Sequence, residues 1–410
     1  MAHVLILGGG TTGISAALAL ARFGFSPILV ERSPCIGGTA NELACKGVRQ
    51  CVRCDVCLAT DKVAIVAGSD EIITIKDSKL EMLERRSGRY RATLSRSKLV
   101  DDEICTRCGR CMEACKGSAI TMYSAREGIF FCIDQERCAH TRNGCEECSV
   151  ACPQGAIDLE GEEETLEVEA DAIIVAIGSV PFDPSADRRL GYGVVDGVVT
   201  SLEVERGIGK MDELGRRIAS GRPGKICFIQ CVGSRDARFG AHLCSKVCCK
   251  YSMKIAKLIK AMSPATEITF TFMDWRPLER GDDLLEWASL EKGVRAIRSR
   301  PSEVFTGDDG RPVMRYALPG DLGVVEEAFD LVVLSVGMRP SPHNEEIAET
   351  IGAKLNPHGF FFSEGRQART LEEKGVVFAG TCAGPKDIEE SSMEGAVAAA
   401  KVKKYLEGRK

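Results

Sequence analysis

The sequence predicts an α/β protein with two doubly wound domains, one of them interrupted by a small cysteine-rich domain. A strand, a glycine turn and a helix open the chain at residues 3–33, and a second unit of this kind lies at residues 225–262. Between the two units, nine cysteines fall within residues 105–152, and eight of them form two spaced groups of four. A chain of 410 residues has room for two or three such domains.

Cysteine is the outlier of the composition, with 20 residues in a chain of net charge −5. The acidic balance gives no general affinity for nucleic acid. The opening "MAHVLILGGG" lacks the basic region of a signal peptide, and no apolar run reaches the roughly 18 residues of a membrane span. We therefore expect a cytoplasmic protein whose clustered cysteines bind metal or carry out redox chemistry.

The first glycine turn has the pattern of a dinucleotide fingerprint. Gly8, Gly10 and Gly13 form G-x-G-x-x-G between an apolar strand and a helix, and Glu31 ends the next strand. In this pattern the first glycine allows the turn, the second lets backbone approach a pyrophosphate, and the third allows close helix packing. Glu31 would accept a hydrogen bond from a ribose hydroxyl. The alternative is a similar unit that binds no dinucleotide.

Two groups of four cysteines follow the spacing of two-cluster ferredoxins. In such proteins the fourth cysteine of each group ligates the cluster of the other group. The spacing predicts a ferredoxin-like insertion over residues 101–160 that holds two [4Fe–4S] clusters, with zinc sites or a disulfide knot as alternatives. One predicted cluster takes Cys105, Cys108, Cys111 and Cys152, and the other takes Cys138, Cys145, Cys148 and Cys115.

Three later segments belong with the first fingerprint. Residues 170–181 and 329–340 each place an apolar strand before a glycine and a proline, and residues 375–406 are a strand, a loop and a small-residue helix. Together they resemble flavoprotein disulfide reductases of the thioredoxin and glutathione reductase kind, where paired segments link two dinucleotide domains. The resemblance implies FAD at the first fingerprint. It also implies cofactor contacts from Gly38, Gly178, Gly337, Gly380 and Ile388.

A third cysteine group follows the sequence Gly-Gly-Thr. Disulfide reductases carry a redox pair here, but Ala40 replaces its first cysteine and Cys45 stands at the second position. A single thiol disfavours dithiol catalysis. Cys51, Cys54 and Cys57 follow at C-x2-C-x2-C, and with Cys45 they predict a third [4Fe–4S] cluster near the flavin. A zinc site or metal-free thiols are the alternatives.

The second strand–turn–helix unit has lost most of its glycines. Its turn reads Gln230-Cys-Val-Gly-Ser-Arg235, where a nicotinamide site would show G-x-G-x-x-G. The predicted NAD(P)-type domain is therefore degenerate, although NAD(P)H binding stays open. The role of the cysteines in and after this turn also stays open: Cys231, Cys244, Cys248 and Cys249.

The motifs "CIGG", "QCVGSRD", "CSKVCCKYSMK" and "FAGTCAGPKDI" together resemble the A subunit of heterodisulfide reductase and its HdrA-like relatives, over nearly the whole chain. The resemblance implies a cytoplasmic FAD and iron–sulfur subunit of a hetero-oligomer from anaerobic metabolism. Its partners would be HdrB/HdrC-like subunits, another iron–sulfur dehydrogenase or ferredoxin. The resemblance also implies that Cys231 ligates a cluster near the flavin. Lys254 would approach the flavin ring, where a cation stabilises a reduced, anionic flavin.

The predicted function is electron transfer, with the flavin as the junction between two-electron and one-electron carriers. Some family members bifurcate electrons, but the long family form has cluster domains before and after the part that this chain matches, which argues for simple transfer. The alternative is an NAD(P)H-dependent flavoprotein reductase that feeds electrons through its ferredoxin domain. A third hypothesis is an iron–sulfur scaffold without flavin.

The predicted domains are FAD-binding at 1–100, 161–205 and 341–410, ferredoxin-like at 101–160 and NAD(P)-type at 206–340.

Three expectations concern the remaining segments. Cys132, Cys227 and Cys382 lie in or beside apolar segments and are expected to be buried free thiols. The acidic run "EGEEETLEVEAD" is expected to form a solvated hairpin. The basic run "RRSGRYRATLSRSK" would face an acidic partner.

Overall fold

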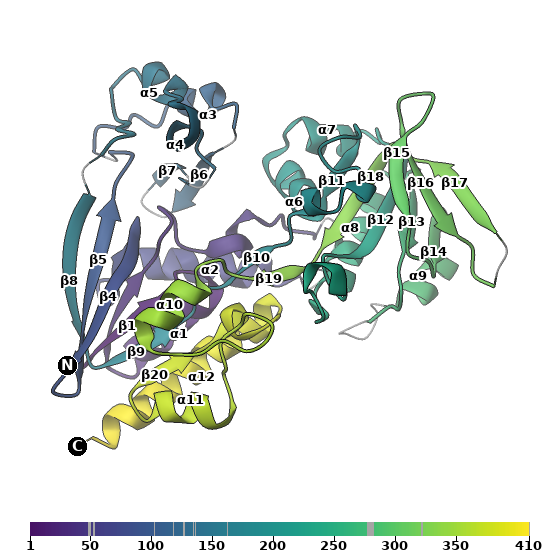
Figure 1. Ribbon diagram of the computed structural model, residues 1–410. Coiled ribbons are helices and arrows are strands. Elements are labelled where there is room, and N and C mark those ends of the chain that lie inside the picture. The colour runs from purple at the N-terminus through teal and green to yellow at the C-terminus, as the bar shows by residue number, and fades with distance from the viewer. Residues whose placement is uncertain are drawn as a thin grey trace.

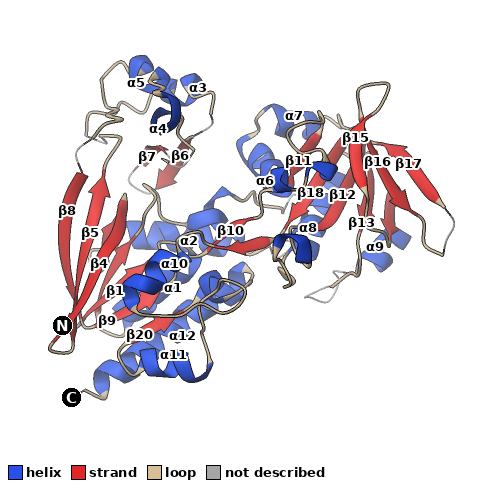
Figure 2. Cartoon of the chain, viewed as in Figure 1, coloured by secondary structure: helices blue, strands red, loops and turns tan. Residues whose placement is uncertain are grey.

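The computed structural model is a two-domain α/β protein with an inserted third domain (Figure 1). Helices and strands alternate through both large domains (Figure 2). No helix among the described residues is both long and apolar enough to cross a bilayer. The structure describes residues 1–47, 51, 54–101, 103–117, 119–125, 128–133, 135, 137–161, 163–276, 283–320 and 323–409.

The first domain is built on a five-stranded parallel sheet. In spatial order its strands are β20 (Val376–Phe378), β9 (Ala172–Val175), β1 (His3–Leu7), β2 (Ser26–Val30) and β3 (Ile73–Ile75). The β1 side chains alternate between two cores, as expected for a strand covered on both faces. Val4 and Ile6 pack with helices α1 (Thr11–Arg22), α2 (Val56–Ala67) and α12 (Ile388–Glu407). Leu5 and Leu7 pack toward α10 (Asn344–Ile351) and α11 (Gly365–Glu372).

A three-stranded antiparallel sheet covers that second face and carries the insertion. Its strands, in spatial order, are β4 (Ser78–Arg86), β5 (Arg89–Ser97) and β8 (Glu163–Ala170). The predicted acidic hairpin is wrong, because the acidic run forms β8 and pairs with β5. Arginines of the basic run, which forms β5, already pair with carboxylates of this protein. Arg89 contacts Glu169, and Arg91 and Arg96 lie close to other glutamates of β8. Opposite charges that face each other on the neighbouring strands β5 and β8 thus form ion pairs within the sheet.

The insertion lies between β5 and β8, beyond the end of the three-stranded sheet (Figure 1). Its small core contains apolar residues together with the thiols of the predicted ferredoxin motifs. Its elements are α3 (Arg110–Ala114), β6 (Ile120–Ala125), β7 (Gly128–Ile133), α4 (His140–Asn143) and α5 (Glu147–Ala151).

One covalent bond ties the insertion to the first domain. Cys132 of β7 forms a disulfide with Cys35, which follows β2, across a sequence separation of 97 residues. The expectation that Cys132 is a free thiol is therefore wrong, because the fold brings a second cysteine to it in the core of the first domain. Cys227 and Cys382 are free and fully buried, as predicted.

The second domain repeats the doubly wound plan. Its parallel strands, in spatial order, are β11 (Val198–Thr200), β18 (Leu331–Val336), β12 (Lys225–Val232), β13 (Glu267–Thr271) and β14 (Val294–Ile297). Its helices are α6 (Ser201–Lys210), α7 (Glu213–Ala219), α8 (Cys248–Met262) and α9 (Leu284–Leu290). An antiparallel meander completes it: β15 (Glu303–Thr306), β16 (Pro312–Ala317) and β17 (Val324–Ala328).

Two short antiparallel strands join the domains. They are β10 (Ser179–Pro181) and β19 (Met338–Pro340), which end the two strand–Gly–Pro segments singled out in the sequence. The chain therefore crosses between the domains twice, side by side. The remaining elements are short 3-10 turns: η1 (Gly38–Glu42), η2 (Pro184–Ala186), η3 (Arg188–Leu190), η4 (Ala237–Phe239) and η5 (Gly380–Ala383).

Candidate flavin pocket and cysteine sites

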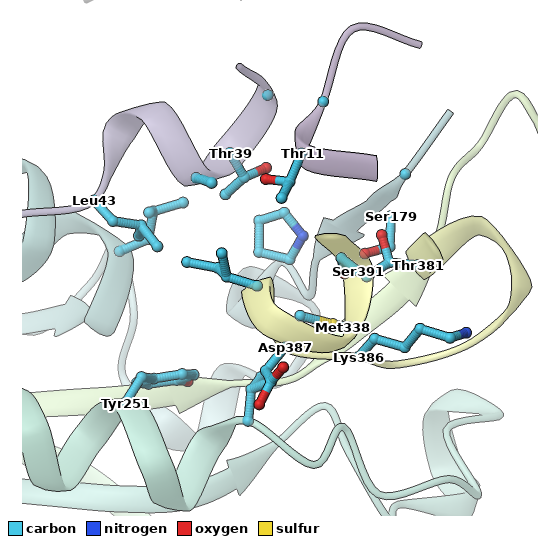
Figure 3. Close-up of a pocket in the computed structure, with 18 of the residues that line it drawn as sticks. Thr11, Thr39, Leu43, Ser179, Tyr251, Met338, Thr381, Lys386, Asp387 and Ser391 are labelled. Atoms are coloured by element: carbon cyan, nitrogen blue, oxygen red, sulfur yellow. The ribbon is translucent and has the colours of Figure 1, made fainter. Parts of the chain in front are cut away.

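A cavity of about 360 Å³ lies between the two large domains. Its volume falls within the usual range for ligand pockets. Figure 3 shows side chains from three parts of the chain around it: Thr11 and Thr39 from the N-terminal segment, Tyr251 from α8, and Asp387 at the start of α12. The carboxyl ends of parallel strands from both domains open into this cavity, which is where doubly wound folds bind ligands.

The fingerprint glycines have the three geometries that the sequence predicts. Gly8 has φ +103°, and a Cβ there would overlap the Ala176 backbone. Gly10 lines the cavity, and a Cβ there would meet nothing within 4 Å, so a ligand has room to approach the backbone. A Cβ at Gly13 would overlap the Gly8 carbonyl oxygen, so this glycine allows α1 to pack against the turn. The pocket therefore fits a dinucleotide pyrophosphate at the N-terminus of α1.

Glu31 lies at the mouth of the fingerprint turn and lines the cavity. Its Oε2 accepts a hydrogen bond from the Gly9 N–H at 2.6 Å, and its Oε1 accepts from the Ser33 backbone and hydroxyl, each at 2.8 Å. Burial raises the pKa of this carboxyl above its ordinary value, against the lowering effect of these hydrogen bonds. The carboxylate is thereby held in place beside the turn, where a ribose would lie.

The other predicted cofactor residues gather around the same cavity. Gly38, Gly178, Gly337 and Ile388 line it. Gly380 does not line it but allows close packing, because a Cβ there would overlap Thr12. Lys254 lines the cavity and is 2% exposed, whereas Cys231 lies outside the lining.

The N-terminus of α12 points at the cavity through a capping box. Asp387 accepts a hydrogen bond from the Glu390 N–H, and the Glu390 carboxylate accepts one from the Asp387 N–H. Such a cap satisfies two otherwise unpaired backbone donors and leaves the positive end of the helix facing the ligand. Its signature, Asp followed three residues later by Glu, stands in the sequence and could have been used to find Asp387.

Sequence reasoning missed two buried lysines that cross between the domains. Lys46 Nζ lies 2.7 Å from Glu205 of α6, and both side chains are 5% exposed or less. Lys250 Nζ, on α8, lies 3.1 Å from Asp387 and 3.5 Å from Asp55. All five residues line the cavity. No spacing in the sequence marks these pairs, because each joins residues more than 130 positions apart.

Four cysteines come together at the turn between β12 and α8. Burial raises the pKa of the Cys248 thiol well above its ordinary value, and the neighbouring thiols of Cys231, Cys249 and Cys244 raise it further. Burial likewise raises the pKa of Cys249 to about 11, with Cys231 and Cys244 again contributing. The four sulfurs are therefore mutual neighbours. Cys244 is partly exposed and the other three are buried.

The ferredoxin-like insertion brings three cysteines of each predicted set near one another. Burial raises the pKa of Cys111 to about 11, and its thiol neighbours are Cys105 and Cys108. Burial also raises the pKa of Cys148, and its thiol neighbours are Cys138 and Cys115. Cys115 thus reaches across to the second set, as the ferredoxin pattern requires.

No group of three or more His, Cys, Asp or Glu side chains within the described ranges is arranged around a single metal ion. A cubane differs from such a site, because each of its four thiolates binds a different iron. The thiol-only donor sets of the insertion and of the β12–α8 turn fit that chemistry.

The predicted third group is more open. Cys45, Cys51 and Cys57 are exposed, and Cys54 is half-buried and lines the flavin cavity. Residues 48–50, 52 and 53 between them lie outside the described residues. A cluster at Cys45–Cys57 therefore stays a prediction.

The turn of the second domain keeps one glycine, Gly233, which follows β12 as Gly8 follows β1. A Cβ at either glycine would overlap its neighbours, the Phe182 ring at Gly233 and the Ala176 backbone at Gly8. The turn is also filled by hydroxyls: Ser234 Oγ donates to the Leu243 carbonyl and accepts from the Ser245 N–H at 3.0 Å. Arg235 stands where the second glycine of a fingerprint beginning at Gly233 would be.

Comparison with known proteins supports FAD and 4Fe-4S binding. A family profile of FAD-dependent oxidoreductases matches residues 3–48, and a 4Fe-4S binding domain profile matches residues 98–121. The iron-sulfur A subunit of CoB–CoM heterodisulfide reductase from Methanocaldococcus jannaschii is 33% identical over 97% of this chain, and an A subunit from Methanopyrus kandleri is 36% identical over 97%. The chain is thus similar to heterodisulfide reductase A subunits over nearly its whole length. It spans 63% of the length of each of these two relatives.

Solved structures place this HdrA-like chain in the thioredoxin reductase fold. The thioredoxin reductase of Lactococcus lactis superposes with a TM-score of 0.55 at 16% identity, and that of T. acidophilum with 0.53 at 13%; each match covers both chains fully. The predicted fold class, two dinucleotide-binding domains with an inserted ferredoxin-like domain, is confirmed.

Proposed function

We propose that this chain is the electron-transfer core of an HdrA-like oxidoreductase complex. The observation that carries the proposal is the dual use of α8. Cys248 and Cys249 begin this helix and belong to the four-cysteine group, while Lys250, Tyr251 and Lys254 of the next turns line the flavin cavity. One rigid element therefore joins the two candidate redox sites.

The residues of the cavity fit FAD. Gly10 and the start of α1 would hold the pyrophosphate, Glu31 the ribose, and the capped start of α12 the region of the ring. Bound FAD would supply the exchange of two-electron and one-electron steps. Lys254, buried on α8, would hold positive charge against the ring and favour its reduced, anionic form.

The cysteines fit iron–sulfur clusters. We assign two [4Fe–4S] clusters to the insertion and one to Cys231, Cys244, Cys248 and Cys249. Whether Cys45–Cys57 adds another is tested by iron content, at about four irons per cluster. Substitution C231S/C248S is expected to remove about four irons from the anaerobically purified protein and C51S/C54S another four. An unchanged iron content in either variant rejects the corresponding site.

The partners are proposed from the relatives. One relative is named as the A subunit of an H(2):CoB-CoM heterodisulfide,ferredoxin reductase, and another as that of a ferredoxin:CoB-CoM heterodisulfide reductase. HdrB/HdrC-like subunits and ferredoxin are thus the proposed partners. Electron bifurcation would require electrons to leave the flavin along two routes. The insertion and the β12–α8 turn each supply one candidate route.

The competing function is an NAD(P)H-dependent reductase, favoured by the doubly wound second domain. Anaerobic stopped-flow mixing separates the two. We expect NADH and NADPH to leave the flavin absorbance unchanged over seconds, because the turn after β12 lacks the later glycines of a nicotinamide fingerprint. We expect reduced ferredoxin to bleach it. Rapid bleaching by either nicotinamide would reject the proposal in this form.

A further inference from the structure

We propose that the carboxyl edge of the second-domain sheet, beside the four-cysteine group, is a docking surface for a small acidic one-electron carrier protein. The inference rests on the proposed function, because it assigns the surface through which electrons enter or leave. It concerns a part of the edge that the flavin cavity does not use.

The edge divides into three neighbouring parts. The parallel order β11–β18–β12–β13–β14 places the carboxyl ends of all five strands on one side. The flavin cavity lies where β11 and β18 end, since Ser201 and Gly337 line it. The four-cysteine group begins at Cys231 of β12. Arginines follow β13 and β14, at Arg276, Arg298 and Arg300.

The arginines form two networks in which they outnumber the carboxylates. Asp236 pairs with both Arg238 and Arg300, and Arg238 continues to Asp187, which pairs with Arg189. In the second network Asp274 pairs with Arg235 and Arg276. Five arginines thus share three aspartates. Because each guanidinium has five N–H donors, these pairs orient the side chains and leave outward donors unused.

These arginines reach the cysteine group itself. The Cys231 thiol has Arg235 as a charged and hydrogen-bonded neighbour. Arg276 contacts Cys244, the one partly exposed thiol of the four, and its backbone contacts Cys249. The solvent side of the cysteine group is therefore rimmed by guanidinium groups, while α8 carries its inner side to the flavin cavity.

The chemistry selects an acidic protein as the occupant. The whole chain has net charge −5, so this positive edge is a local feature rather than part of a basic surface. Exposed side chains here include Arg238 and Arg300, each 43% exposed, and Arg276 at 50%. Complementary charge speeds and orients encounter between proteins, which suits a carrier that must come close to one redox centre and then leave.

The test uses the anaerobic holoprotein, with an acidic two-cluster ferredoxin as the probe and a basic cytochrome c as the charge control. Binding is measured by biolayer interferometry between about 25 and 200 mM salt, a range over which screening changes substantially. We expect the variant R238Q/R276Q/R300Q to bind ferredoxin at least about tenfold more weakly, with a flatter salt dependence. The matched control R89Q/R91Q/R315Q removes arginines of 40–46% exposure that pair with glutamates elsewhere.

The docking surface is overturned by ferredoxin binding that is unchanged in the test variant, by an equal loss in the control variant, or by equal binding of cytochrome c. Displacement of ferredoxin by NADPH would also overturn it and assign the edge to a nucleotide. The variant C231S/C248S separates this inference from the proposed function. Binding retained with slower flavin-to-ferredoxin electron transfer supports both. Binding retained with an unchanged transfer rate keeps the surface and rejects the cluster at these cysteines.

Discussion

At the scale of single residues, the buried lysines at the domain boundary have the largest expected effect. Lys250 is 7% exposed and faces two carboxylates, Asp55 and Asp387. Removing one member of a buried ion pair leaves uncompensated charge, which costs about 3 kcal/mol or more. We expect K250M to lower the melting temperature by several degrees and to weaken FAD retention.

The matched control for Lys250 lies four residues earlier on the chain. Lys246 pairs with Glu390 of the same helix α12, but both side chains are about 40% exposed. Exposed pairs contribute at most about 1 kcal/mol. Thermal melting of K246M should therefore stay close to that of the wild type, and equal losses in the two variants would contradict the assigned role of burial.

The lowered pKa of Asp387 predicts that its contribution to stability depends on pH. Burial alone would raise its pKa, but hydrogen bonds from the Glu390 backbone and from Lys250 outweigh burial and lower it. A carboxyl whose pKa is lower in the folded state stabilises the protein above its ordinary pKa, and this contribution is lost as pH falls through the folded-state value. Melting of D387N should thus fall below wild type at pH 7, with the difference shrinking below about pH 4. A constant difference across this range would contradict the assignment.

At the scale of elements, the two glycines of the first turn separate folding from binding. A Cβ at Gly10 meets nothing, but one at Gly13 overlaps the Gly8 carbonyl oxygen. We expect G10A to fold with a normal circular dichroism spectrum and to lose FAD, and G13A to reach the soluble fraction poorly. Flavin release and thermal melting measure the two effects. FAD retained by G10A would show that no phosphate approaches this backbone.

The disulfide between β7 and the loop after β2 holds the whole insertion against the first domain. The bond between Cys132 and Cys35 joins the insertion to the first domain. Cys35 lies two positions before Gly37, which lines the flavin cavity. We expect C132S to increase proteolytic cleavage in the insertion while leaving FAD content unchanged. Peptide mapping without reductant checks the bond itself. A Cys35–Cys132 peptide missing from the wild-type map would exclude the bond in solution.

Sequence reasoning succeeded where function depends on local spacing. The glycine fingerprint at Gly8–Gly13 and the approach of Cys115 to Cys148 were predictable, because each follows from a fixed pattern over a few residues. The pairs Lys46–Glu205 and Cys35–Cys132 were not, because only the fold brings their partners together. The acidic strand β8 was missed for the same reason: its neighbour β5 lies across the whole insertion.

At the scale of the whole molecule, the candidate redox sites lie in separate parts of the fold that are joined through the first domain. The insertion carries two cysteine sets at the end of one sheet, and the second domain carries one at the edge of another (Figure 1). The flavin cavity lies between the two large domains. Under the proposed function, this arrangement would let a two-electron centre exchange electrons with two different surfaces of the protein.

The shared walls of the cavity also have a consequence for the lifetime of the bound cofactor. Lys46–Glu205 and Lys250–Asp387 clamp the two domains together on the rim of the cavity. A flavin seated there would contact residues of both domains, so we expect it to leave faster when these buried pairs separate. The dissociation rate of the flavin thus reports the opening of the domains. A chain stripped of its flavin should refill as slowly as that opening permits.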